Sequence, residues 1–150
     1  NLARAVGLDS GFPLIGYRSV AKNLELTADN AEDIAEIVLD AGENTLDVDD
    51  ATLREIREFT DTVNEMTELG VRSVVERDYD LALQTKKLFR DVEDSQTEIL
   101  TSLPEMDNEK LLQVREVLVA LQQTAQYAVR NAEIATNLAL DTNSEYVTIT

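Results

Sequence analysis

Five carboxylates stand at helical spacing within one short stretch of the chain: Glu25, Asp29, Glu32, Asp33 and Glu36. All except Asp33 follow an i, i+4, i+7, i+11 pattern, which places four side chains on one stripe of a helix with the fifth beside them. Oxygen ligands of this kind suit hard cations such as magnesium, calcium, manganese or ferric iron. The stripe therefore predicts binding of a hard divalent or ferric metal ion, with a solvated acidic face as the alternative.

The composition excludes most familiar enzyme chemistry. The chain has no cysteine and no histidine, which rules out disulfides, iron–sulfur clusters, thiolate zinc, a cysteine nucleophile and the usual general base. Carboxylates on an exposed helical stripe also lack the buried setting that general acid–base catalysis requires. We therefore expect a protein that is not an enzyme.

The net charge argues against nucleic acids and membrane surfaces as partners. Thirteen lysine and arginine residues against 30 aspartate and glutamate residues give −17, a charge that repels phosphate backbones and anionic lipid headgroups. The sequence has no apolar run of membrane-spanning length, and we expect no signal peptide. We expect a cytoplasmic protein without membrane insertion.

The acidity has two explanations. The basic residues are four lysines and nine arginines, and a surface poor in lysine and rich in carboxylates is typical of a protein from a halophilic organism. In about 1 M salt the Debye length is about 3 Å, so repulsion between carboxylates no longer opposes folding. An ordinary acidic cytoplasmic protein is the alternative.

Four long segments carry apolar residues at alternating spacings of three and four, the pattern of amphipathic helices. The first helix is expected from Pro13 to Ala41, because proline suits a first turn and Gly42 can cap the C-terminal end. Its apolar row, a narrow seam for helix packing, consists of Tyr17, Ala21, Leu24, Ala28, Ala31, Ala35 and Val38.

The other three helices follow after short turns. Asp49 and Asp50 can cap the second helix, in which Gly70 interrupts the apolar pattern and is interpreted as a point of close packing. A capping aspartate within 77–80 begins the third helix, and a turn at 104–108 precedes the fourth. The alanine-rich row of the fourth helix should let a neighbour approach closely; it is Leu111, Val114, Leu118, Leu121, Ala125, Ala128, Ala132, Ala135 and Ala139.

These segments predict an all-α fold, an antiparallel bundle of four long helices. Upstream, the end of an earlier helix is expected before Gly7, followed by a loop at 8–12. The tail 142–150 alternates like a short strand and should be flexible on its own.

The first and last long helices resemble each other after a shift of 97 residues. The identical pairs are Arg18/Arg115, Val20/Val117, Leu24/Leu121, Thr27/Thr124, Ala28/Ala125, Ala31/Ala128, Ala35/Ala132, Glu36/Glu133 and Ile37/Ile134. Alanine periodicity alone explains about half of these matches, but not the arginine, threonine, glutamate and isoleucine pairs. We interpret the chain as the last helix of one repeat (1–48), a complete three-helix repeat (49–141) and the tail (142–150).

The first copy carries a family resemblance. Its segment Leu24-Glu25-Leu26-Thr27-Ala28-Asp29-Asn30-Ala31-Glu32-Asp33-Ile34-Ala35-Glu36 resembles the motif Leu-Glu-Arg-Ile-Ala-Asp-His/Tyr-Ala-x-Asp-Ile-Ala-Glu of the PhoU-like phosphate-uptake regulators. It departs from that motif at Leu26, Thr27 and Asn30. The segment 76–82 is similar to the family's link between first and second helices. The family fold is two tandem three-helix repeats. The resemblance covers residues 7–141 and implies that the first two helices of the first repeat are missing.

The resemblance also carries a metal-binding motif onto the chain. In the family, Glu/Asp-x-x-x-Asp motifs bind metal ions or clusters, and the matching residues here are Glu25 and Asp29. In the second copy the same positions hold Gln122 and Gln126, whose neutral amides are poor ligands. The helix before this copy keeps Asp91, Asp94 and Glu98, which we expect to form ion pairs with Arg90 and Arg130.

The family resemblance implies a non-enzymatic regulator that acts by protein–protein contacts in phosphate uptake and phosphate signalling. Its partners would be a phosphate transporter or sensor-kinase proteins. The alternative is an acidic helical dimerisation or accessory module of a larger transcription regulator or ion-transport regulator. A homo-oligomer is also expected, because the incomplete repeat lacks two of the helices that should pack on its alanine seam, and a homodimer could supply them.

Overall fold

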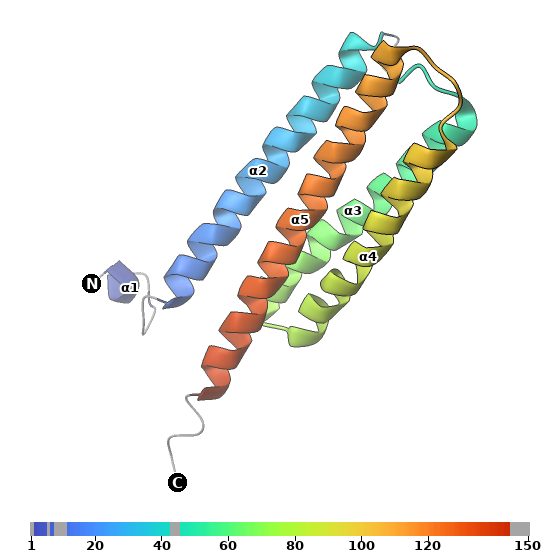
Figure 1. The fold of residues 1–150 in the computed structure, drawn as a ribbon. Helices are drawn as coiled ribbons and strands as arrows, with labels where there is room; N and C mark the ends of the chain where they lie inside the picture. The colour runs from blue at the N-terminus through green and yellow to red at the C-terminus, as the bar shows by residue number, and fades with distance from the viewer. Residues whose placement is uncertain (1, 6, 8–11, 43–45, 145–150) are drawn as a thin grey trace.

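The computed structural model describes residues 2–5, 7, 12–42 and 46–144. Its helices are α1 (Leu2–Ala5), α2 (Phe12–Asp40), α3 (Asp50–Glu76), α4 (Tyr79–Ser102) and α5 (Asn108–Ser144). The four long helices form an antiparallel bundle, which confirms the predicted all-α fold (Figure 1). No helix in these ranges is both long and apolar enough to cross a membrane.

Helix α5 is the centre of the bundle. It packs along α2 on one side and against α3 and α4 on the other, while α3 and α4 also pack on each other (Figure 1). Among the described helices, α5 is the one against which α2 packs extensively. The architecture is therefore a three-helix unit, α3 to α5, with α2 laid along its last helix.

Local signals in the sequence place the helix ends. The carboxylate of Asp49 accepts hydrogen bonds from the backbone N–H groups of Ala51 and Thr52, at 2.9 and 2.8 Å, and begins α3. Asp78 caps α4 in the same way. Gly42 has a φ of +85°, a conformation that glycine adopts without strain, just beyond α2. The predicted caps at these positions are confirmed.

Apolar side chains of the last three long helices form the core. Val63 and Met66 of α3, Val92 of α4 and Leu118 of α5 are fully buried. Gly70 is a point of close packing, as predicted, since a Cβ atom there would lie 2.7 Å from the carbonyl oxygen of Ala128. The alanine-rich row of α5 thus allows the close approach of α3.

Helix α2 turns a different row toward α5 from the one that the sequence singled out. Val20, Asn23 and Asn30 are buried, and Thr27 and Ile34 are partly buried. The central part of the predicted row, from position 21 to 35, is exposed. The described part of this chain therefore leaves that apolar row uncovered.

Two predicted boundaries need correction. Phe12 belongs to α2 and not to the preceding loop, and the predicted tail begins too early because α5 continues through 142–144 to Ser144. Unbroken helical hydrogen bonding from the long α5 explains this extension. Residues 8–11 of the predicted loop and 145–150 of the predicted tail lie outside the described residues.

Candidate functional site

The predicted acidic stripe lies on the solvent side of α2. Glu25, Asp29, Glu32, Asp33 and Glu36 are all exposed. Glu25 forms an ion pair with Lys22, one helical turn away, at 3.0 Å. Most of the stripe therefore faces water, and its two ends have different surroundings.

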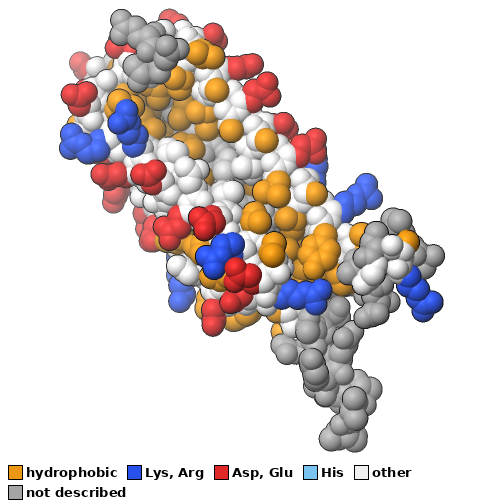
Figure 2. All heavy atoms as spheres, turned by 180° about the vertical axis from the view of Figure 1, so that it is seen from behind, with side chains coloured by type: hydrophobic (Ala, Val, Ile, Leu, Met, Phe, Trp, Pro, Cys, Tyr) orange, Lys and Arg blue, Asp and Glu red, His pale blue; other side chains and the backbone are white. Residues whose placement is uncertain are grey.

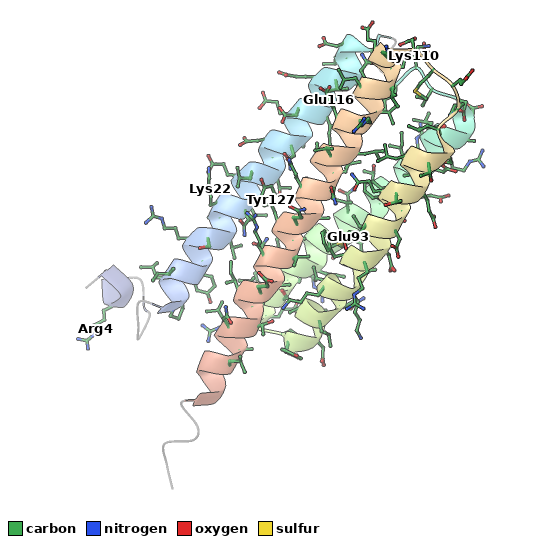
Figure 3. The ribbon with its side chains drawn as sticks, in the orientation of Figure 1. Arg4, Lys22, Glu93, Lys110, Glu116 and Tyr127 are labelled. Carbon is green, nitrogen blue, oxygen red and sulfur yellow. The ribbon has the colours of Figure 1, made fainter. Side chains whose placement is uncertain are left out.

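The C-terminal end of the stripe borders a groove between α2 and α5. The groove has a volume of about 740 Å³. Its α2 wall is formed by Asp33, Glu36, Ile37 and Asp40, and its α5 wall by Leu112, Arg115, Glu116, Val119, Ala120 and Gln123. Figure 3 shows Glu116 on the upper part of α5, where this helix runs beside α2. We call this feature the acidic groove.

The acidic groove combines negative charge with accessible apolar surface. Four carboxylates and one guanidinium line it, so its formal charge is 1 − 4 = −3. Leu112 is 56% exposed and Val119 46% exposed, although both are large apolar side chains. A surface of this kind suits a ligand that carries positive charge and apolar groups together.

The stripe that was predicted as a metal site overlaps only part of this groove. Asp33 and Glu36 were predicted site residues and line it, whereas Glu25, Asp29 and Glu32 do not. Asp40 was missed although it continues the stripe one turn beyond Glu36. Arg115 and Glu116 belong to a distant helix, and no local pattern could have placed them opposite the stripe.

The carboxylates do not form a prepared metal site. Within the ranges that the structure describes, no group of three or more acidic side chains is placed so that it could hold a metal ion. The stripe comes from a single helix and points into solvent, so water would fill most ligand positions of a hard cation bound there. Metal binding at Glu25 and Asp29 therefore stays a prediction.

The predicted ion-pair network is wrong. The ion pairs between described residues are Lys22–Glu25, Arg72–Glu68, Arg72–Glu76 and Lys110–Asp47, and none of them joins Arg90 or Arg130 to Asp91, Asp94 or Glu98. Arg130 instead lies over the ring of Tyr127 in its own helix, with the guanidinium carbon 5.4 Å from the ring centre. Exposed pairs gain too little Coulomb energy to hold two long side chains together.

A buried polar ladder holds the two walls of the acidic groove together. The side-chain amide of Asn30 donates to the carbonyl oxygen of Ala120 at 3.2 Å and to the hydroxyl of Thr124 at 3.1 Å. Asn23 donates to Asn131 at 2.8 Å. Polar pairs inside a helix interface favour one alignment of the helices over others. The ladder therefore sets which residues of α5 line the acidic groove.

The chain was compared with known protein families, with characterised proteins and with solved structures. None of these comparisons finds a match. The resemblance to PhoU-like regulators thus stays a prediction, and the geometry of the acidic groove is the independent guide to function.

Proposed function

We propose that the chain is a non-enzymatic regulator that acts by protein–protein contacts in phosphate uptake and phosphate signalling. Two lines of reasoning support the proposal. The motif at 24–36 resembles that of PhoU-like regulators, and this resemblance supplies the phosphate context. The acidic groove supplies a surface on which a protein partner can bind.

The acidic groove is the observation that carries the proposal. Leu112 and Val119 line it and remain exposed, and covering a side chain of this size contributes about 1.5 to 3 kcal/mol. The carboxylates around them disfavour an acidic partner and increase the rate of encounter with a basic one. The matching ligand is a segment with apolar residues flanked by lysine or arginine.

The proposed source of this segment is a phosphate transporter or a sensor kinase. A helical or extended segment of either protein would place apolar side chains against Leu112 and Val119. Its basic side chains would then pair with Glu36, Asp40 and Glu116. Binding should weaken at high salt, because charge pairs at the rim of an interface are screened.

The second candidate function is an accessory module of a larger transcription or ion-transport regulator. One observation favours it: the apolar row on the outer side of α2 is exposed and has the character of an association surface. A module of this kind would associate without any link to phosphate. The two candidates therefore differ in whether phosphate regulation depends on the chain.

Charge reversal in the acidic groove tests the proposal. Cells that lack the gene would be complemented with the wild type, with Glu36→Arg/Asp40→Arg, or with Asp91→Arg/Asp94→Arg. The last pair changes the net charge equally but lies on the exposed surface of α4. Expression of the phosphate transporter at high phosphate is the readout.

We expect the wild type and the α4 variant to restore repression of the transporter, and the groove variant to fail. Circular dichroism should show equal helicity for all three proteins, because every changed residue is exposed. Equal repression by all three would show that the acidic groove does not carry the function.

A further inference from the structure

Helix α2 has an exposed apolar face, away from the acidic groove. Ala21, Leu24, Ala28, Ala31 and Ala35 form an exposed apolar row there, and Leu24 is 40% exposed. Next to this row a groove of about 390 Å³ opens between α2 and α3. Figure 2 shows hydrophobic side chains gathered in a band along this back face of the molecule.

The internal repeat shows what kind of surface this row is. A shift of 97 residues carries it onto Leu118, Leu121, Ala125, Ala128 and Ala132, which are all buried. In α5 these residues pack under α3 and α4, with Gly70 of α3 in close approach to Ala128. Matching side chains are therefore covered by helices in one copy and exposed in the other. The row on α2 has the composition of a helix-packing surface.

We propose that α2 of a second copy of this chain packs antiparallel on this row, around a two-fold axis at Ala28. The row extends seven residues to either side of Ala28, to Ala21 and to Ala35. Leu24 then lies near Ala31 of the second copy, where a large side chain meets a small one, and Ala21 lies opposite Ala35, where two small side chains meet. Small residues let two helices approach closely, and a two-fold contact requires such self-complementarity.

The charges along α2 favour the antiparallel direction. Arg18 and Lys22 lie in its first half, and Glu36 and Asp40 lie in its second half. Antiparallel packing brings the basic half of each copy beside the acidic half of the other. The α3 and α4 helices of a second copy are less suitable occupants, because they already cover α5 of their own chain.

One contact in this arrangement is repulsive. Glu25 of each copy lies beside Glu32 of the other, since both flank the apolar row on the same side. Salt screens like charges on a protein surface. Salt also screens the attraction between the basic and acidic halves, but each copy carries a net charge of −17, so repulsion between the copies is the larger effect. The proposed dimer should therefore become tighter as potassium chloride rises, which is opposite to the salt response expected for the acidic groove.

The test combines oligomeric state with cross-linking at the axis. Light scattering should give the molar mass of a dimer for the full chain in about 2 M potassium chloride. Salt at this concentration screens the charges on the surface. Because the chain has no cysteine, Ala28→Cys should form a disulfide-linked dimer under mild oxidation. Ser19→Cys, which is exposed on a different side of α2, should remain mostly monomeric on the denaturing gel.

Two further variants test the interface by charge. Ala28→Arg should abolish the dimer with unchanged helicity, because Ala28 is exposed in the monomer. Glu25→Lys should tighten the dimer at low salt on the order of tenfold, whereas Asp94→Lys on α4 should leave it unchanged. A monomer at all concentrations in high salt, or equal cross-linking of the two cysteine variants, would overturn the proposal whether or not the acidic groove binds a regulator's partner.

Discussion

Asn23 of α2 and Asn131 of α5 form a buried hydrogen bond, with 2.8 Å between the donor Nδ2 and the acceptor Oδ1. The two residues are 7% and 2% exposed. A partner lost from such a pair leaves a polar group without hydrogen bonds in an apolar interface, which is costly. The pair therefore links the alignment of α2 and α5 to the shape of the acidic groove.

Removal of one member of this pair should destabilise the fold. Asn131→Ala leaves the Asn23 amide unsatisfied, and we expect a loss of about 1 to 3 kcal/mol in the free energy of unfolding. Urea denaturation followed by circular dichroism measures it. In a double-mutant cycle, Asn23→Ala/Asn131→Ala should cost less than the sum of the single changes; strict additivity would mean that the bond contributes nothing.

Gly70→Ala tests the close approach of α3 to α5. The new Cβ atom would lie 2.7 Å from the carbonyl oxygen of Ala128, so the helices must move apart at a cost of about 1 to 3 kcal/mol. The higher helix propensity of alanine acts in the opposite direction and stabilises the variant by about 1 kcal/mol. A lower melting temperature therefore reports the clash. Glu65→Ala, on the exposed side of α3, is the control, and a more stable Gly70→Ala protein would refute the packing.

Asp49 should make the stability of the chain depend on acid pH. The hydrogen bond from the Thr52 N–H, helped by the Thr52 hydroxyl and the Ala51 N–H, lowers the pKa of Asp49 from its ordinary 3.8. A lowered pKa in the folded state gives stability that is present above the unfolded pKa and is lost as pH falls through the folded pKa.

Melting temperatures measured from neutral pH to below 3.8 test this dependence. Asp49→Asn should flatten the acid side of the profile, because the amide still accepts hydrogen bonds but does not titrate. Asp61→Asn, which removes an exposed carboxylate elsewhere in α3, should keep the wild-type profile. Identical profiles for the wild type and Asp49→Asn would contradict the capping role of the charge.

The metal hypothesis predicts that the two copies of the motif differ: the first copy, with Glu25 and Asp29, should bind metal, and the second, with Gln122 and Gln126, should not. Any affinity for manganese or ferric citrate should depend on Glu25 and Asp29, because hard cations need anionic oxygens. Glu25→Gln/Asp29→Asn should remove the heat of binding in isothermal titration. Equal binding by this variant, or no binding above background by the wild type, would leave the stripe as a solvated acidic face.

Local patterns accounted for most of the fold, but not for the orientation of α2. Caps such as Asp49, Asp78 and Gly42 depend on residues close in sequence, so the helices could be predicted. The buried face of α2 depends on its contact with α5. The apolar row of α2 and the row through Asn23 and Asn30 both repeat with helical spacing. The hydrogen bonds from Asn23 and Asn30 to α5 show that the second row is the one buried in the α2–α5 interface.

The candidate site was predictable to a similar depth. Asp33 and Glu36 share one helix, and their spacing alone indicated an acidic surface. The opposite wall, with Arg115 and Glu116, is brought there by tertiary packing. The exposed state of Leu112 and Val119 also follows from tertiary structure, since apolar residues on a helix are normally expected to face the core.

The rate of phosphate uptake tests the proposed function most directly. Cells with and without the gene would be grown at high phosphate, and the initial rate of labelled phosphate uptake would be measured in both. The proposal predicts a faster, unrepressed rate in the cells that lack the gene, and a return to the lower rate when the wild-type gene is restored. Equal rates in both cell types would contradict a role in phosphate regulation.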